Sequence, residues 1–232
     1  TGAMRPWNAI GSDGPPNLFN AVRLAAGDKT RCFGTTVLMN DQIFPARDVT
    51  KTDTLRLNTF QTREFGDLGT VDEKEIRIQR APSRLQDCAH PAAWRTPFDL
   101  SRTPPKALPR VEIVPTYVDA GPESVTAFAA AGVAGLVFAG TPSPAQLQAA
   151  MAAGKQGVVL VAANGYGAGA VHLDPGIGVI GAEDLSAKKA RILLLLALSQ
   201  TKDVRQIGDW FASYGAAETD GASYPDRAGD DK

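Results

Sequence analysis

Cysteine and histidine are scarce in this chain, which has two of each among 232 residues. Cys32 and Cys88 are too few for a disulfide scaffold, and one bridge or two free thiols are both possible. His90 and His172 stand far apart in the sequence, without a neighbouring group of ligand-type side chains. The sequence therefore predicts no metal site.

A basic cluster and a long apolar run are missing too. The formal net charge is -1, so neither nucleic acid nor an anionic membrane is expected as a partner. The longest apolar run, 192–198, is far shorter than the roughly 20 residues that span a bilayer. No signal peptide is visible, and the sequence leaves a periplasmic and a cytoplasmic location both open.

What the chain does contain is a regular α/β pattern in its second half. Three apolar runs of strand length lie at 111–118, 135–139 and 158–162. Two helical patterns, at 123–131 and 145–153, separate them. Such alternation predicts a parallel sheet with right-handed crossovers. A short strand at 177–180 and a long helix at 187–199, capped by Ser186, are expected to follow.

The first 80 residues are expected to form the latter part of an α/β domain with a flavodoxin-like parallel sheet. Gly2-Ala3 is expected to end a strand, and residues 35–39 to form the next one. Between them, Ser12 or Asp13 can cap a helix. The residues expected on the apolar face of this helix are Leu18, Ala21, Val22 and Ala25.

Proline marks the boundary between these two units, because six of the 16 prolines lie between residues 81 and 109. We interpret this stretch as an ordered linker, attached to one domain through Trp94 and Phe98. The predicted organisation is a domain at 1–80, the linker at 81–109, a second domain at 110–214 and a disordered tail at 215–232.

The segment ARDVTKTDT at 46–54 is the strongest candidate for chemistry. Lys51 lies there between two threonines, after Asp48 and before Asp53, in a polar loop expected at the carboxyl end of a strand. Ligands bind at that edge of open α/β sheets, and a lysine there can hold a hydroxyl or carboxylate in its reactive state. The alternative is a solvated lysine paired with Asp48 or Asp53.

Three blocks of the sequence resemble the bacterial type II L-asparaginase and glutaminase-asparaginase family. They are GAMRP at 2–6, SDGPPNLFNAV at 12–22 and MNDQIFPARDVTKTDT at 39–54, and KARILLLLALSQTKD at 189–203 resembles the last helix of the family. The resemblance implies a homo-oligomer, tetrameric in the family, that hydrolyses a small amide without a cofactor. Lys51 would support a catalytic threonine-aspartate pair, and the backbone carbonyl of Ala3 would contact the substrate amide.

Two motifs of the family do not occur in these 232 residues. They are TGGTIA, which carries the nucleophilic threonine, and HGTDT, which carries the Thr-Asp pair. We therefore expect this chain to match the C-terminal two-thirds of an amidohydrolase, to be inactive alone and to need the missing segment or a companion chain. Thr1 could act as an N-terminal nucleophile, but a structural strand residue is the favoured interpretation.

The second domain also departs from the family pattern. Ser143 lies in a turn where the family usually has asparagine, and the loop GYGAGAVH at 165–172 has no glutamate to pair with a substrate ammonium. The resemblance predicts hydrolysis of asparagine, and perhaps of glutamine, in the complete enzyme. The alternatives are a non-catalytic relative or interaction protein, and an amidotransferase subunit of similar fold.

Overall fold

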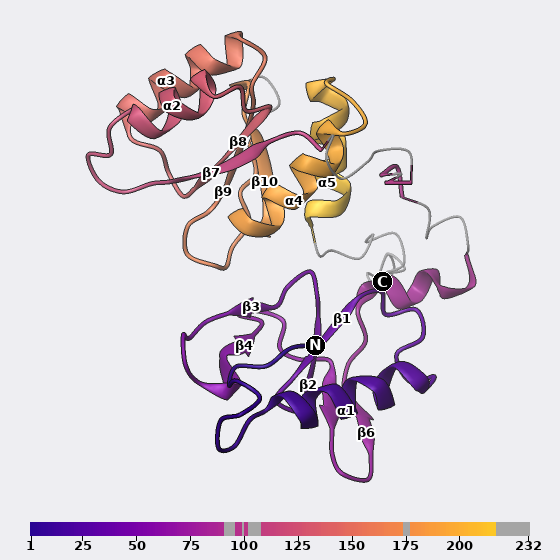
Figure 1. The fold of residues 1–232 in the computed structure, drawn as a ribbon. Coiled ribbons are helices and arrows are strands. Elements are labelled where there is room, and N and C mark those ends of the chain that lie inside the picture. Colours follow the sequence, from indigo (N-terminus) through magenta and orange to yellow (C-terminus); the bar gives the residue numbers. More distant parts are fainter. Residues whose placement is uncertain (91–95, 99, 102–107, 174–176, 217–232) are drawn as a thin grey trace, which may run out of the picture.

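The computed structural model describes residues 1–232 except 91–95, 99, 102–107, 174–176 and 217–232. Two four-stranded β-sheets, each with its own helices, form the N-terminal and C-terminal parts of the molecule (Figure 1). Trp94 and the predicted tail from 217 onward lie outside the described residues, whereas Gly215 still belongs to the last helix. The domain bounds expected from the sequence stay predictions.

The N-terminal sheet is built from hairpins rather than from crossovers. Its strand order is β1-β2-β5-β6, comprising Thr36–Met39, Gln42–Pro45, Gly69–Val71 and Ile76–Ile78. All pairs described in this sheet are antiparallel, so the parallel pairing expected here is wrong. The cause is the turn Asn40-Asp41, whose φ angles of 50° and 62° favour a tight hairpin that reverses the chain. Residues 2 and 3 are not in a strand.

Helix α1, Gly14–Ala26, buries a different face from the one expected. Leu18 and Val22 are 56% and 60% exposed, whereas Leu24 is only 4% exposed. Asn17 and Asn20 are buried on the inner face because their amides bind the neighbouring loops. Of the predicted apolar face, Ala21 packs against the N-terminal core.

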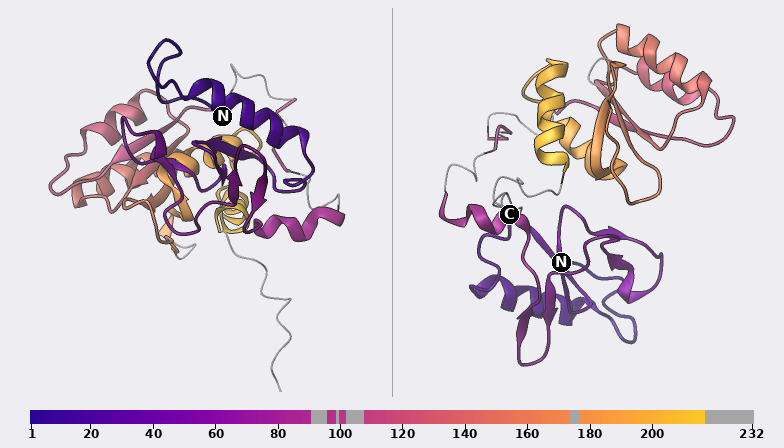
Figure 2. Two further views of the ribbon diagram at one scale, coloured as in Figure 1. Left: turned by 90° about the horizontal axis from the view of Figure 1, so that it is seen from below. Right: turned by 180° about the vertical axis from the view of Figure 1, so that it is seen from behind.

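The C-terminal part follows the predicted α/β pattern. Its parallel sheet has the order β10-β9-β8-β7, with strands Ile180–Ser186, Val159–Asn164, Gly135–Ala139 and Val111–Pro115. Helices α2 (Glu123–Ala130) and α3 (Pro144–Lys155) cover one face, and α4 (Ala187–Leu198) and α5 (Val204–Gly215) cover the other (Figures 1 and 2). The last strand begins three residues later than expected. The α/β class is confirmed.

The segment between the two sheets is anchored at two places. Helix η2, Ser83–Ala89, carries Cys88, which forms a disulfide with Cys32 and settles the open question about the two cysteines. Farther along, Phe98 packs edge-on against Trp210, with ring centroids 5.2 Å apart, and also contacts Tyr214. The predicted anchoring role of Phe98 is therefore confirmed, and its partner is α5.

Candidate active site

Lys51 lies on a small two-stranded ribbon beside the N-terminal sheet. Strand β3, Thr50–Lys51, pairs antiparallel with β4, Phe60–Gln61, which follows the short helix η1, Leu57–Thr59. The amide and the hydroxyl of Thr52 both donate to the carbonyl of Thr59, at 2.8 and 2.9 Å. The backbone that carries Lys51 is therefore held in place on both sides.

The sequence pattern predicted that Lys51 follows the carboxyl end of a parallel strand. The structure does not show this. Strand β2 intervenes between β1 and Lys51, and it turns the chain back along the sheet. Lys51 instead lines a cavity of about 120 Å³ between the two parts of the molecule. The residues lining it are Arg47, Asp48, Thr50, Lys51, Arg63, Glu64, Phe65, Gly167, Asp184 and Ser186. The lysine thus lies at the junction of the two parts of the molecule.

The two carboxylates nearest to Lys51 in the sequence have arginine partners. Asp48 pairs with Arg47 at 2.8 Å, and Asp53 pairs with Arg56 at 3.8 Å. Lys51 itself is exposed and forms no ion pair within 4 Å among the described residues. Among the described residues no ion pair within 4 Å supports the paired-lysine interpretation, although the exposed ammonium is solvated and its charge helps to lower the pKa of Asp53.

Asp53 closes the loop that follows Lys51. Its carboxylate accepts hydrogen bonds from the backbone amides of Leu55 and Arg56, at 2.7 and 2.9 Å. These two amides lower the pKa of Asp53, with smaller help from the charges of Arg56 and Lys51. Asp53 is therefore charged at neutral pH and contributes a negative charge beside Lys51.

The Ala3 loop is organised by a buried carboxylate. Asp13 accepts hydrogen bonds from the amides of Met4 and Arg5, the closest at 2.9 and 2.8 Å, and from Asn17 at 3.1 Å. Burial acts to raise the pKa of Asp13, but these hydrogen bonds outweigh it and the pKa lies below its ordinary value. The capping role expected for Asp13 is only positional, because its side chain makes no cap hydrogen bond.

Ala3 and Lys51 are not brought together in a described contact. Ala3 is exposed and is not among the residues that line the Lys51 cavity. The hydroxyl of Thr1 donates to the carbonyl of Leu38 at 2.6 Å, which agrees with the structural interpretation of this threonine. The role expected for the Ala3 carbonyl stays a prediction.

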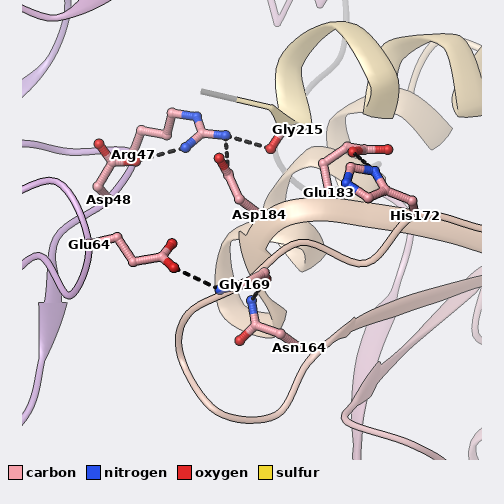
Figure 3. A network of polar contacts seen from close by, with 9 residues as sticks. All are labelled: Arg47, Asp48, Glu64, Asn164, Gly169, His172, Glu183, Asp184 and Gly215. Atoms are coloured by element: carbon pink, nitrogen blue, oxygen red, sulfur yellow. Dashed lines mark hydrogen bonds and ion pairs between the residues drawn. The ribbon is translucent and has the colours of Figure 1, made fainter. Parts of the chain in front are cut away.

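The two altered segments of the C-terminal domain have structural roles of their own. Ser143 caps α3 through a capping box with Gln146, and its hydroxyl also donates to the carbonyl of Ala120 at 2.6 Å. In the glycine loop, Asn164 binds both Gly167 and Gly169. This loop is then held by the N-terminal domain (Figure 3): Glu64 accepts from the amide of Gly169 at 3.1 Å.

Sequence reasoning missed the residues that join the two domains at this site. Arg47 and Lys189 form hydrogen bonds across the boundary, to Asp184 and to the carbonyl of Ala46 respectively. The sequence signal for Arg47 was its charge shortly before Lys51. Among the described residues no group of three or more histidines, cysteines or carboxylates could hold a metal ion. None of the described helices has the length and apolar character needed to cross a bilayer.

Models of two protein families match this chain. "Asparaginase, N-terminal" matches residues 1–84, and "Glutaminase/Asparaginase C-terminal domain" matches residues 110–211. A solved structure of a probable cytoplasmic L-asparaginase from Campylobacter jejuni superposes with a TM-score of 0.81 at 33% identity, over 91% of this chain and 67% of that one. The chain belongs to the asparaginase family.

The curated relatives of this asparaginase-family chain include proteins named L-asparaginase and proteins named glutaminase-asparaginase. L-asparaginase 2 of Escherichia coli is 37% identical over 222 residues, which are 92% of this chain and 62% of the relative. Glutaminase-asparaginase of Acinetobacter glutaminasificans is 33% identical over 223 residues, 92% of this chain and 65% of the relative. The chain thus spans a little under two-thirds of the length of these relatives.

Proposed function

We propose that this chain forms part of an amidohydrolase that converts the side-chain amide of asparagine, and of glutamine as a second substrate, into the acid and ammonia. Its relatives are named L-asparaginases and glutaminase-asparaginases, and the likeness covers 92% of the chain. The observation that carries the proposal is the position of Lys51. It lies in the DVTKT block on which the resemblance rests, and it lines an interdomain cavity without an ion pair among the described residues.

The chemistry follows from that position. A threonine hydroxyl is a poor nucleophile, so amide hydrolysis needs a base within hydrogen-bond reach and a fixed charge that orients it. An ammonium on a hydrogen-bonded ribbon supplies such a charge with little reorganisation. In this proposal Lys51 holds the threonine-aspartate pair in place, and the Ala3 carbonyl accepts a hydrogen bond from the leaving amide nitrogen.

The proposal assigns the nucleophile to a segment outside these 232 residues, because TGGTIA and HGTDT do not occur in them. We expect the chain alone to release no ammonia from asparagine. A chimera that joins the corresponding segment of the Escherichia coli relative to residue 1 is expected to gain turnover. An ammonia-release assay on both proteins measures this, with glutamine as the second substrate.

Within the active chimera, Lys51→Met is expected to lower kcat by about 10² to 10⁴, with a much smaller change in KM. The physical reason is that Lys51 would hold the catalytic pair rather than bind substrate. Lys74→Met is the matched control, because Lys74 is an exposed lysine on the far hairpin of the N-terminal sheet. Near-normal kcat in the Lys51 variant would contradict the assignment.

A second candidate is a non-catalytic member of the family. It is favoured by Ser143, which caps a helix where asparagine is expected, and by a glycine loop that is held by Glu64. This candidate predicts that the chimera folds but neither releases ammonia from asparagine nor binds aspartate. Calorimetric titration with aspartate, run beside the ammonia assay, distinguishes the two candidates.

A further inference from the structure

Arg47 has three oxygen acceptors, and two of them lie in the C-terminal domain (Figure 3). Its Nη1 donates to Asp48 at 2.8 Å, and its Nη2 donates to Asp184 and to the backbone carbonyl of Gly215. We call these four residues the Arg47 clasp. The side chains of Asp48 and Asp184 are only 15% and 14% exposed. Charge-assisted hydrogen bonds are strong when the partners are withdrawn from water in this way.

An irregularity in strand β10 brings Asp184 to Arg47. The pairing of β10 with β9 shifts register between Gly181 and Ser186, and Glu183 adopts a left-handed φ of 51°. Glu183 faces His172, at 2.6 Å from its Nδ1, while the next residue, Asp184, faces Arg47 (Figure 3). Such backbone strain persists only where surrounding contacts hold it. Here the polar contact between Glu183 and His172 and the ion pair between Asp184 and Arg47 hold the strand.

A lysine of the C-terminal domain contacts the same turn. Lys189, on α4, donates from Nζ to the carbonyl of Ala46 at 2.5 Å. Partial burial lowers the pKa of Lys189, and the carboxylate of Asp48 opposes this shift. The C-terminal domain therefore contacts the turn at 46–48 twice. Lys189 binds the carbonyl of Ala46, and Asp184 binds the guanidinium of Arg47.

The link from this turn to Lys51 is short and stiff. The amides of Asp48 and Val49 both donate to the carbonyl of Pro45 at 3.1 Å, and the side chain of Val49 is buried. The ribbon that carries Lys51 begins at the next residue, and Arg47 and Lys51 line the same cavity. A displacement of Arg47 would thus be passed directly to Lys51.

We infer that Arg47 is a positioning residue: through the Arg47 clasp it fixes the ribbon that carries Lys51 relative to the C-terminal domain. The inference rests on the proposed function, in which Lys51 orients the catalytic pair. Displacements of about 1 Å at catalytic groups can cost about 10²-fold in rate. The clasp therefore acts on turnover through Lys51.

The first test uses the 232-residue chain and needs no activity. The amide of Thr52 donates to Thr59 across the ribbon at 2.8 Å, so its hydrogen exchange reports opening of the ribbon. We expect Arg47→Met to accelerate this exchange by about tenfold and Arg47→Lys by less, because lysine keeps the charge but not the planar fork. Arg77→Met is the matched control, since Arg77 also has two carboxylate partners but is 61% exposed on β6.

The second test measures kinetics in the chimera, normalised to the folded fraction. Arg47→Met is expected to lower kcat by about 10 to 100-fold with KM within about twofold, and Arg47→Lys is expected to recover part of that loss. A purely structural role would lower the folded fraction and leave kcat per folded molecule unchanged.

The two tests separate this inference from the proposed function. Unchanged Thr52 exchange in Arg47→Met, or exchange that rises equally in Arg77→Met, would overturn the positioning role whatever the activity. An inactive wild-type chimera would count against the proposed function, and the exchange data would then still decide whether the clasp holds the ribbon. An active chimera in which Arg47→Met keeps a normal kcat would also overturn the inference.

Discussion

At the scale of single residues, buried polar side chains hold the GAMRP loop at 2–6, one of the blocks that carry the family resemblance. Asp13 holds the amides of Met4 and Arg5, and Asn17 binds the carbonyl of Gly2 and the amide of Asn40. These contacts satisfy backbone groups that would otherwise be costly to bury. The GAMRP loop is thereby fixed to α1 and to the β1–β2 turn, although it belongs to neither element.

We expect Asp13→Asn to lower the free energy of unfolding at pH 7 by about 1–3 kcal/mol, because a neutral amide replaces a carboxylate that accepts several hydrogen bonds. The folded-state pKa of Asp13 is lowered, so its contribution is complete above the ordinary value of 3.8 and is lost as pH falls through the lower folded value. The difference between wild type and variant should therefore shrink in strong acid. Urea unfolding across that pH range measures it.

Asp28→Asn is the control for this comparison, because Asp28 is exposed in the loop after α1. Its effect should stay within about 0.5 kcal/mol. A variant at Asp13 as stable as the one at Asp28 would mean that the hydrogen bonds to Met4 and Arg5 contribute little.

At the scale of elements, α1 shows how tertiary contacts select the buried face of a helix. Its apolar residues suggested one face, yet Leu24 packs into the N-terminal core while Leu18 and Val22 remain exposed. The reason is that Asn17 and Asn20 find partners in the neighbouring turn, so a polar face can be buried without cost.

Leu24→Ala is therefore expected to lower the free energy of unfolding by about 2–5 kcal/mol, since it removes a buried side chain and leaves a cavity. Leu18→Ala, the matched change on the exposed face, should cost less than about 0.5 kcal/mol. Denaturant melts of both variants check the assignment. Equal losses would show that Leu18 is also packed in solution.

At the scale of the whole molecule, three kinds of contact hold the two domains and the segment between them. The Arg47 clasp joins the sheets, Phe98 packs on α5, and the Cys32–Cys88 disulfide ties η2 to the loop after α1. The disulfide closes a stretch with a sequence separation of 56 residues. It therefore restricts the unfolded chain over much of the N-terminal domain.

Reduction of this disulfide is expected to lower the free energy of unfolding by roughly 4 kcal/mol, the chain-entropy cost of a loop of that length. Urea melts with and without a reductant measure the loss. The double variant Cys32→Ser/Cys88→Ser should melt like the reduced protein and should not respond to the reductant. Two titratable thiols in the untreated folded protein would contradict this prediction.

Local sequence signals predicted the helices and strands that have a clear apolar periodicity and clear capping or turn residues at their ends. The parallel strands β7 to β9, the helices between them and Ser186 before α4 were all placed correctly, because apolar periodicity and turn residues act within a few positions. The DVTKT block likewise pointed to Lys51. The N-terminal sheet was misjudged, since the left-handed turn Asn40-Asp41 reverses a chain that the resemblance placed in a parallel sheet.

The sequence by itself determined the α/β class, the family resemblance and the choice of Lys51 as the lysine of interest. Only the tertiary structure decided that Lys51 lines an interdomain cavity and that Arg47 is bound by Asp184. The physical reason is sequence distance: Arg47 and Asp184 are 137 positions apart, and no local pattern encodes such a pair. Their meeting depends on how the two sheets dock, and burial and charge pairing together determine that docking.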